Sequence, residues 1–309
     1  MKLYLHVGMT KSGSTSIQNA FSEHAETILK KYGVAYPAPE ASFQNHHELY
    51  TLIWDADPAP VQAYLEEACA KAQRRGARSV LLSSEDLFLL PNEPEKMQCL
   101  ARVVEALKGV ETRIVFVVRH PRTWMRSHIA QLLSNGAFAL DEYSDRYAEL
   151  PQNIAECIRA YAALDPEILL MSYGRSAANG TLVKDFFGLL DLALEEDWER
   201  NDNATGRERF YSMEAQIGLL CGLRAFNQEL HPNSKSIDAL RSSIRELVDS
   251  MSKNASVARL LNPMEAILRH ELNILIDNSI STLSPADQEY LNRLDPDDHL
   301  PPFQNIECY

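Results

Sequence analysis

The chain has 309 residues, of which 45% are hydrophobic and 24% charged, and its 43 acidic and 30 basic side chains give a formal net charge of −13. These values are ordinary for a globular protein with a sizeable core, and the acidic balance argues against a broad nucleic-acid-binding surface. A small anionic ligand is not excluded, because charges more than about 8 Å away are largely screened at physiological salt.

The alternation of helix and strand patterns along the chain predicts an α/β fold. The strand KLYLHV ends at Gly8, and RIVFVV is the clearest of the later strands. Strands separated by helices favour a parallel central sheet flanked by helices. The elements we expect, in chain order, are strand 2–7, helix 14–31, strand 33–37, helices 46–54 and 59–74, strands 79–83 and 113–118, helix 121–135, strand 167–173 and helix 182–190.

Beyond about residue 212 the pattern changes to helices alone. The polar segment 201–209 (NDNATGRER) separates the two styles. We therefore expect residues 1–200 to form the α/β core and residues 201–309 to form a helical extension packed on it, as parts of one continuous domain. The helices expected there span residues 212–230, 236–251, 263–282 and 285–293.

The cysteines and the N-terminus indicate a cellular location. The five cysteines are far apart, odd in number and form no CxxC pair, which favours reduced thiols. The chain begins MKLYLHVG, directly in a predicted strand, and no stretch approaches the ~18 continuous apolar residues of a membrane span. We expect a cytoplasmic protein without an integral membrane segment.

The first chemical motif is LHVGMTKSGSTSI at residues 5–17, where a strand passes through a glycine-containing loop into a helix. Unpaired amides and the helix dipole make such an N-terminus an anion site. A phosphate or sulfate group would be held by the charge of Lys11 and by the loop residues Ser12, Gly13, Ser14, Thr15 and Ser16. The alternative is a serine-rich turn that only caps the helix.

The loop departs from the ATP-binding pattern G-x-x-x-x-G-K-[ST]. Gly8 and Gly13 have the required separation, but Ser14 occupies the position of the lysine. The order K-S-G-S-T instead resembles the loop K-[ST]-G-[ST]-T of sulfotransferases that use 3′-phosphoadenosine 5′-phosphosulfate (PAPS).

A second motif follows the strand RIVFVV. Arg119 ends this strand and Ser127 comes eight residues later, in the sequence RHPRTWMRS. A guanidinium fork and a hydroxyl near a helix N-terminus suit a phosphate monoester, whereas the alternative is a solvated arginine at a strand end. In the same family, an arginine and a serine at these positions bind the 3′-phosphate of PAPS.

The resemblance covers roughly residues 1–190, since the segment 171–192 (MSYGRSAANGTLVKDFFGLLDL) is similar to the family's strand and "FLGL" helix. It implies a P-loop NTPase-like sulfotransferase fold, PAPS as donor, 3′,5′-adenosine bisphosphate as product and no required metal. Thr10 and Ser16 replace a proline and a tryptophan of the family's cytosolic branch. The chain is closer to bacterial and carbohydrate-type members, which implies a hydroxyl acceptor, less often an amine, on a carbohydrate or another small molecule.

Three residues are candidates for catalysis. Lys11 would stabilise the charge on the leaving oxygen. Glu85, just past the strand 79–83, would act as general base, although Ser84, Glu85 and Asp86 can also be read as the opening of a helix. His47 is the other candidate base, with His46 beside it, and His6 within the first strand is expected to be packed beneath the loop.

Two other functions remain open from the residues alone. A carboxylate at a strand end, here Glu85, is also where a P-loop kinase or nucleotide hydrolase holds magnesium, and that class would bind ATP with the metal. A binding module that keeps the nucleotide site without reacting is the third possibility. The sequence does not identify the acceptor.

Overall fold

The structure is a computed structural model that describes residues 1–37, 45–107, 109–121, 123–124, 127–128, 140–164, 166–195, 198, 280–281 and 283–293. The chain divides into two compact units. The first comprises Met1–His120, Asn153–Asn203 and Glu289–Tyr309, and the second comprises Pro121–Gln152 and Ala204–Gln288.

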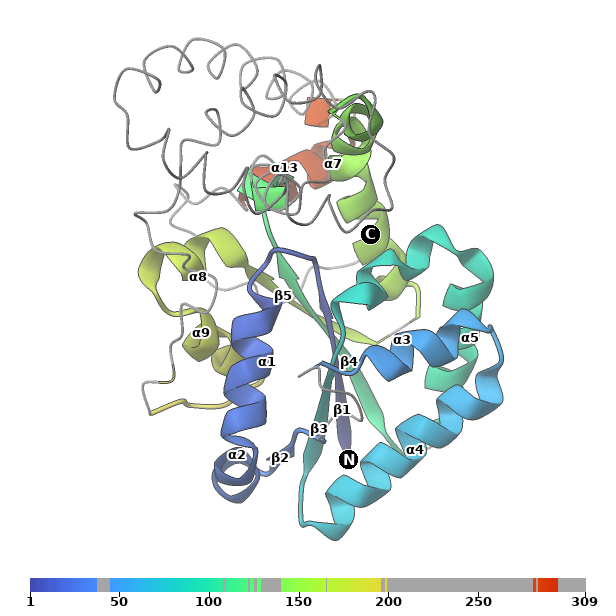
Figure 1. Cartoon of the computed structure of the whole chain (residues 1–309), viewed down its shortest axis with the longest axis vertical. Coiled ribbons are helices and arrows are strands. Elements are labelled where there is room, and N and C mark those ends of the chain that lie inside the picture. The colour runs from blue at the N-terminus through green and yellow to red at the C-terminus, as the bar shows by residue number, and fades with distance from the viewer. Residues whose placement is uncertain are drawn as a thin grey trace, which may run out of the picture. The chain divides into compact units, whose positions relative to one another are not determined.

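The first unit is built on a five-stranded sheet in which every strand pair is parallel (Figure 1). The strand order is β2-β3-β1-β4-β5. This confirms the predicted α/β architecture with a parallel central sheet flanked by helices. The strands are β1 (Lys2–Gly8), β2 (Val34–Ala35), β3 (Ser79–Ser83), β4 (Glu111–Val118) and β5 (Glu167–Ser172).

The first strand of the chain lies at the centre of the sheet. In β1, Leu5 is in register with Leu82 of β3 on one side and with Ile114 of β4 on the other. The carboxyl ends of β1, β3 and β4 therefore meet at one edge of the sheet. In open parallel sheets this edge is where ligands bind.

The helices of the described residues follow the predicted order with four additions and one break. They are α1 (Ser14–Glu23), α2 (Ala25–Tyr32), α3 (His47–Trp54), α4 (Pro58–Arg74), the 3-10 helix η1 (Glu85–Asn92), α5 (Pro94–Ala106), α7 (Leu140–Ala162), α8 (Tyr173–Asn179), α9 (Leu182–Leu189) and α13 (Pro285–Arg293). Of these four additions, α5, α7 and α8 were not expected, whereas η1 is the helix that Ser84, Glu85 and Asp86 open in the alternative interpretation of the sequence.

The single helix expected over residues 14–31 was wrong in one respect. The helix ends at Glu23, and His24, with φ −107° and ψ 15°, separates α1 from α2. The change of direction lets Ile28 and Tyr32 of α2 join the core. The strand expected over residues 167–173 also ends one residue early, because Tyr173 begins α8.

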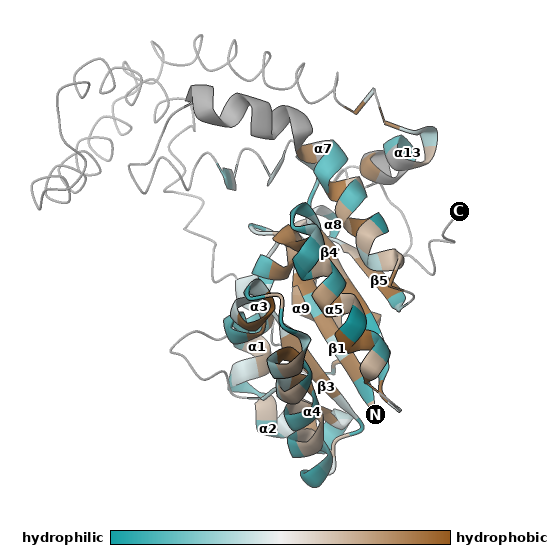
Figure 2. Cartoon of the chain, turned by 90° about the vertical axis from the view of Figure 1, so that its right-hand side faces the viewer, coloured by the Kyte–Doolittle hydropathy of each residue, from teal (hydrophilic) through white to brown (hydrophobic). Residues whose placement is uncertain are grey.

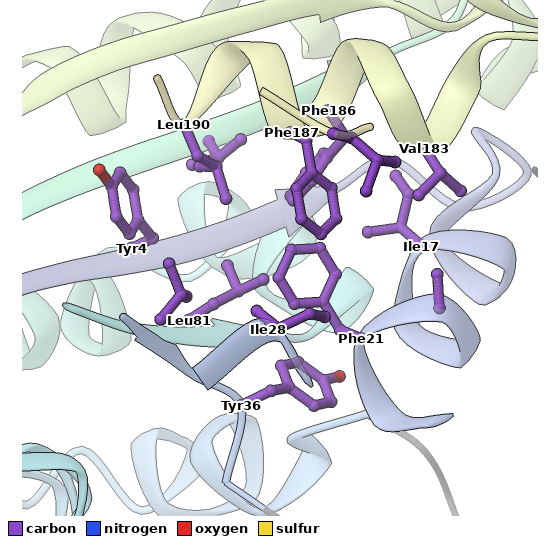
Figure 3. Close-up of a cluster of buried hydrophobic side chains, with 14 of the residues drawn as sticks. Tyr4, Ile17, Phe21, Ile28, Tyr36, Leu81, Val183, Phe186, Phe187 and Leu190 are labelled. Atoms are coloured by element: carbon purple, nitrogen blue, oxygen red, sulfur yellow. The ribbon is translucent and has the colours of Figure 1, made fainter. Parts of the chain in front are cut away.

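One face of the sheet is covered by α1, α2 and α9 (Figure 1). The aromatic side chains Phe21 of α1 and Phe187 of α9 stack with their centroids 4.8 Å apart, and Phe186 meets Phe21 edge to face at 5.7 Å (Figure 3). Aromatic pairs of this kind add about 0.5–1.5 kcal/mol beyond the burial of their surface. This cluster fixes α1 and α9 against the sheet, directly below the loop that follows β1.

The strands are strongly hydrophobic, as Figure 2 shows for β1, β3 and β4. Continuous apolar strands are typical of a parallel sheet that is covered on both faces. On the face opposite α1, Phe116 of β4 packs edge to face on Tyr161 of α7 at 5.4 Å. The Tyr161 hydroxyl donates a 2.7 Å hydrogen bond to the carbonyl of Leu87, which ties η1 to this layer.

Cys69, Cys99 and Cys157, the cysteines within the described residues, are buried and form no disulfide. In the same part of the chain, no helix is both long and apolar enough to cross a membrane. Most of the helices expected after residue 201 lie outside the described residues, as does the boundary expected at 200. The exception is α13, whose bounds match the predicted helix 285–293.

Candidate functional site

The loop between β1 and α1 is tied both to the sheet and to itself. The amide of Met9 donates to the carbonyl of Val117 in β4 at 3.4 Å. Both the amide of Ser12, at 3.2 Å, and its hydroxyl donate to the carbonyl of Met9. The Ser12 hydroxyl, expected to face an anion, is therefore used to close the loop, and Ser12 is completely buried.

Two loop residues adopt the left-handed backbone conformation, Lys11 with φ 62° and Gly13 with φ 82°. For a lysine this conformation costs about 1 kcal/mol or more, a strain that proteins tend to keep at functional sites. At Gly13 a side chain would also meet close neighbours. A Cβ there would lie 2.5 Å from Cδ2 of Leu182 and 2.9 Å from Cε2 of Tyr173, so these side chains of α9 and α8 would have to move.

The N-terminus of α1 has no side-chain cap. Gly13 holds the N-cap position, and the first turn contains no acidic residue. The first amides of a helix have no partners within the helix and carry its positive dipole end. The amides of Ser14, Thr15 and Ser16 therefore lie at an uncapped helix start, where the sequence predicted an anion site, with Ser14 and Ser16 buried and Thr15 exposed.

Glu85 lies against this helix start. Its Oε2 accepts a 2.6 Å hydrogen bond from the hydroxyl of Ser14, although the two residues are 71 positions apart. Glu85 is the first residue of η1, and the preceding Ser84 donates its amide to the carbonyl of His6 in β1. The pairing of β3 with β1 thus brings this carboxylate to the loop, where the sequence analysis expected a base.

The second motif meets the first through Arg119, which directly follows β4. Its Nη1 donates a 2.8 Å hydrogen bond to the carbonyl of Lys11. The guanidinium also lies over the ring of Tyr173, with Cζ 4.8 Å from the ring centroid. Arg119 is therefore held at the loop from two sides, by the carbonyl of Lys11 and by an aromatic face.

The charges of this cluster affect the ammonium group of Lys11. Burial lowers the pKa of Lys11, the positive charge of Arg119 lowers it further, and the carboxylate of Glu85 acts in the opposite direction. The three groups together carry two positive charges and one negative charge. Their sum of one positive charge, added to the positive end of the helix dipole, favours an anionic ligand.

A buried polar network supports the loop from below. The hydroxyl of Ser83, the last residue of β3, lies 2.8 Å from Nδ1 of His6 and accepts from Nε2 of Gln18 at 3.0 Å. His6 is fully buried, and burial lowers its pKa to about 3, so the ring is neutral at physiological pH. Its ring lies under Gly8, where an added Cβ would come within 3.1 Å of Nε2. This confirms the expected place of His6 beneath the loop.

The two adjacent histidines have different environments. His46 is buried, accepts the amide of Ser83 at 3.0 Å and contacts the carbonyl of Pro37 at 3.0 Å, so it joins α3 to the sheet. His47 is exposed, and its Nδ1 lies 2.7 Å from Oδ2 of Asp86, the neighbour of Glu85. Its partner is thus an η1 carboxylate rather than a residue of the loop.

Ser127, expected to help hold a phosphate, belongs to the second unit, where it is helical and partly buried. Its role stays a prediction. In the same unit the rings of Trp124 and His128 stack at 4.5 Å. Arg122 and Arg126 are among the residues that the structure does not describe.

Tyr173 is a residue of the candidate site for which the sequence predicted no role. It touches Gly13 and lies under Arg119, so it links the two predicted motifs. A signal was present, because Tyr173 directly follows β5 and polar groups after parallel strands gather at one edge of the sheet.

Comparisons of the chain with protein-family models, curated proteins and solved structures gave no match.

Proposed function

We propose that this protein is a PAPS-dependent sulfotransferase that transfers a sulfuryl group to a hydroxyl, less often an amine, of a carbohydrate or another small molecule. The observation that carries the proposal is the contact between Arg119 and Lys11. It joins two motifs, 108 positions apart in the sequence, that were each interpreted independently as a phosphate site.

The residues present fit a donor with anionic groups at two places. The uncapped amides of α1 together with Lys11 suit the phosphosulfate, and the guanidinium of Arg119 suits the 3′-phosphate. The predicted role of Ser127 in binding the 3′-phosphate rests on the sequence motif alone. The net positive charge of Lys11, Arg119 and Glu85 agrees with such a ligand.

Sulfuryl transfer breaks the bond between sulfur and the bridging oxygen of the donor and forms a bond between sulfur and the acceptor oxygen. Lys11 would stabilise the negative charge that develops on the leaving phosphate. Glu85 would take the proton of the acceptor hydroxyl. Its Oε2 is already hydrogen-bonded to Ser14, so one carboxylate oxygen is oriented by α1 while Oε1 is left to meet the acceptor.

A P-loop kinase or nucleotide hydrolase is the second candidate, and one contact favours it. The hydroxyl of Ser14 in the loop donates to the carboxylate of Glu85, which follows the neighbouring strand β3. A hydroxyl and a carboxylate at this distance are oxygen ligands that can hold magnesium between them. The absence of a lysine after Gly13 weighs against this alternative, because Ser14 stands there.

The proposal is tested by incubating the purified chain with PAPS carrying radiolabelled sulfate and a panel of saccharide and phenol acceptors, in the presence of EDTA. We expect label on at least one acceptor and its loss in Glu85→Gln. A chain that instead hydrolyses ATP only when magnesium is added would establish the second candidate.

A further inference from the structure

Helix α3 carries three aromatic rings in a row, which we call the aromatic strip: His47, Tyr50 and Trp54. The ring centroids of His47 and Tyr50 are 5.8 Å apart, and those of Tyr50 and Trp54 are 5.5 Å apart. The side chain of His47 is 52% exposed and Trp54 is 49% exposed. Large aromatic surfaces left in water at one place are a common mark of a binding surface.

The strip begins beside the candidate base. His47 is hydrogen-bonded to Asp86, and the residue before Asp86 is Glu85, which contacts Ser14 of the loop. From His47 to Trp54 the helix rises by about 10 Å, at 1.5 Å per residue. A ligand lying along the strip would therefore be elongated, with one end near Glu85.

Carboxylates border the strip. Burial raises the pKa of the Tyr50 phenol, and the negative charges of Asp86 and Glu93 raise it further. Both acids are thus close enough to act on the phenol of the middle ring. The ammonium group of Lys96, which lies at the Trp54 end of the strip, is paired with Glu93 at 3.3 Å.

Lys96 also fixes the ring at the far end. Its Nζ lies 2.8 Å from the centroid of the Trp54 ring, and its side chain is only 12% exposed. One face of the indole is therefore occupied by a held ammonium group, while Trp54 as a whole remains 49% exposed. A ring held in this way loses little further entropy when a ligand stacks on it.

We propose that the aromatic strip is the acceptor subsite of this protein and that it takes an elongated, uncharged oligosaccharide. The carbon-bound hydrogens of a sugar ring pack on aromatic faces, and sugar hydroxyls donate to carboxylates such as Asp86 and Glu93. The acidic border selects against saccharides rich in uronate or sulfate groups, because like charges repel. As an acceptor subsite the strip depends on the proposed sulfotransferase function, whereas saccharide binding does not.

The test is a calorimetric titration of the full chain with chitohexaose, with cellohexaose and with a hexamer of galacturonic acid. We expect at least one neutral hexasaccharide to bind at least tenfold more tightly than the galacturonate hexamer. Trp54→Ala and Tyr50→Ala should each weaken binding about tenfold or more. Trp198→Phe is the matched control, because Trp198 stacks on His24 and not on the strip, and should leave the affinity unchanged.

Three results would overturn the inference: no neutral saccharide binds, the galacturonate hexamer binds more tightly, or Trp54→Ala retains wild-type affinity. Thermal unfolding with 3′,5′-adenosine bisphosphate is measured on the same variants, to show that each is folded and retains its nucleotide site. If the wild type binds the saccharide through the strip but is not stabilised by the nucleotide, saccharide binding at the strip stands and the proposed sulfotransferase function fails.

Discussion

The guanidinium of Arg119 donates a hydrogen bond to the main-chain carbonyl of Lys11, so the residue that follows β4 contacts the loop that follows β1. This contact exists because β1 and β4 are paired along their whole length, up to Gly8 and Val117. Two motifs that are remote in sequence thus become neighbours at the carboxyl edge of the sheet.

Removal of Lys11 should affect the transfer step more than nucleotide affinity. In Lys11→Ala we expect kcat to fall by about 10²–10³, the cost of losing one preorganised group that stabilises transition-state charge.

In Arg119→Ala we expect the affinity for adenosine bisphosphate to fall by about tenfold to a hundredfold, because a charge-assisted hydrogen bond contributes about 1.5–3 kcal/mol. The measurements are steady-state kinetics and calorimetric titration.

The matched control for both variants is Lys71→Ala, which removes a lysine from a surface pair with Glu67 on α4. It should change neither kcat nor affinity. If Lys11→Ala and Arg119→Ala retained wild-type values, the roles assigned to them would be wrong.

Gly13→Ala should abolish nucleotide binding because of the space that α8 and α9 occupy. The new Cβ would lie 2.5 Å from Leu182, in addition to the strain of φ 82°. Gly76→Ala is the control for strain alone, since Gly76 has φ 80° with nothing within 4 Å of an added Cβ. We expect Gly76→Ala to lose about 1 kcal/mol of stability and to bind normally.

The double variant Gly13→Ala, Leu182→Ala separates the two effects at Gly13. It removes the nearest clashing group and should regain part of the nucleotide binding, as measured by calorimetry. Normal binding in the single variant Gly13→Ala would show that the loop does not need the close contact with α9.

The site electrostatics predict the direction in which neighbours move the pKa of Lys11. Burial and Arg119 hold this pKa below 10.5, whereas Glu85 raises it. We expect Arg119→Gln to raise the pKa of Lys11 and Glu85→Gln to lower it. Carbon NMR of the lysine Cε, titrated with pH, measures both, and shifts of opposite sign to these would contradict the geometry.

The buried His6 predicts a loss of stability in acid. The pKa of His6 is about 3 in the folded protein, against an ordinary value of 6.5 in the unfolded chain. Between these values the unfolded chain binds a proton that the folded protein does not, so the free energy of unfolding falls as the pH falls. For one such group, the decrease in the free energy of unfolding approaches about 1.4 kcal/mol per pH unit at pH values well below 6.5.

Urea unfolding between pH 7 and pH 5 measures this slope. We expect His6→Gln to reduce the slope, whatever its effect on stability at pH 7. His46→Gln should act in the same direction, because burial also lowers the pKa of His46. A slope unchanged in both variants would contradict the buried neutral state of these rings.

The parts of the fold that were predicted from sequence are those with strong local patterns. The strands β1, β3 and β4 are continuous or alternating apolar runs, and α13 matches its expected bounds. The break at His24 was missed because neither glycine nor proline marks it. The turn becomes apparent only when Ile28 and Tyr32 are seen to pack in the core.

The sequence predicted those parts of the candidate site that consist of residues adjacent in the chain. It did not predict the parts that depend on tertiary packing. The loop from Lys11 to Ser16 is one contiguous motif, and Glu85 and Arg119 each follow a strand. The role of Tyr173 depends on the order of the strands, which places β5 next to β4. The Ser12 hydroxyl closes the loop on the carbonyl of Met9, a contact that residue type alone does not show, and its expected role toward an anion stays a prediction.

The central claim is tested most directly by a thermal-shift comparison of the wild-type chain with 3′,5′-adenosine bisphosphate in EDTA and with ATP and magnesium. Ligand at a hundred times its dissociation constant stabilises a protein by about 2.7 kcal/mol. We expect the melting temperature to rise by several degrees with the bisphosphate without metal, and this rise to be lost in the double variant Lys11→Ala, Arg119→Ala. A rise with ATP and magnesium and none with the bisphosphate would contradict the account.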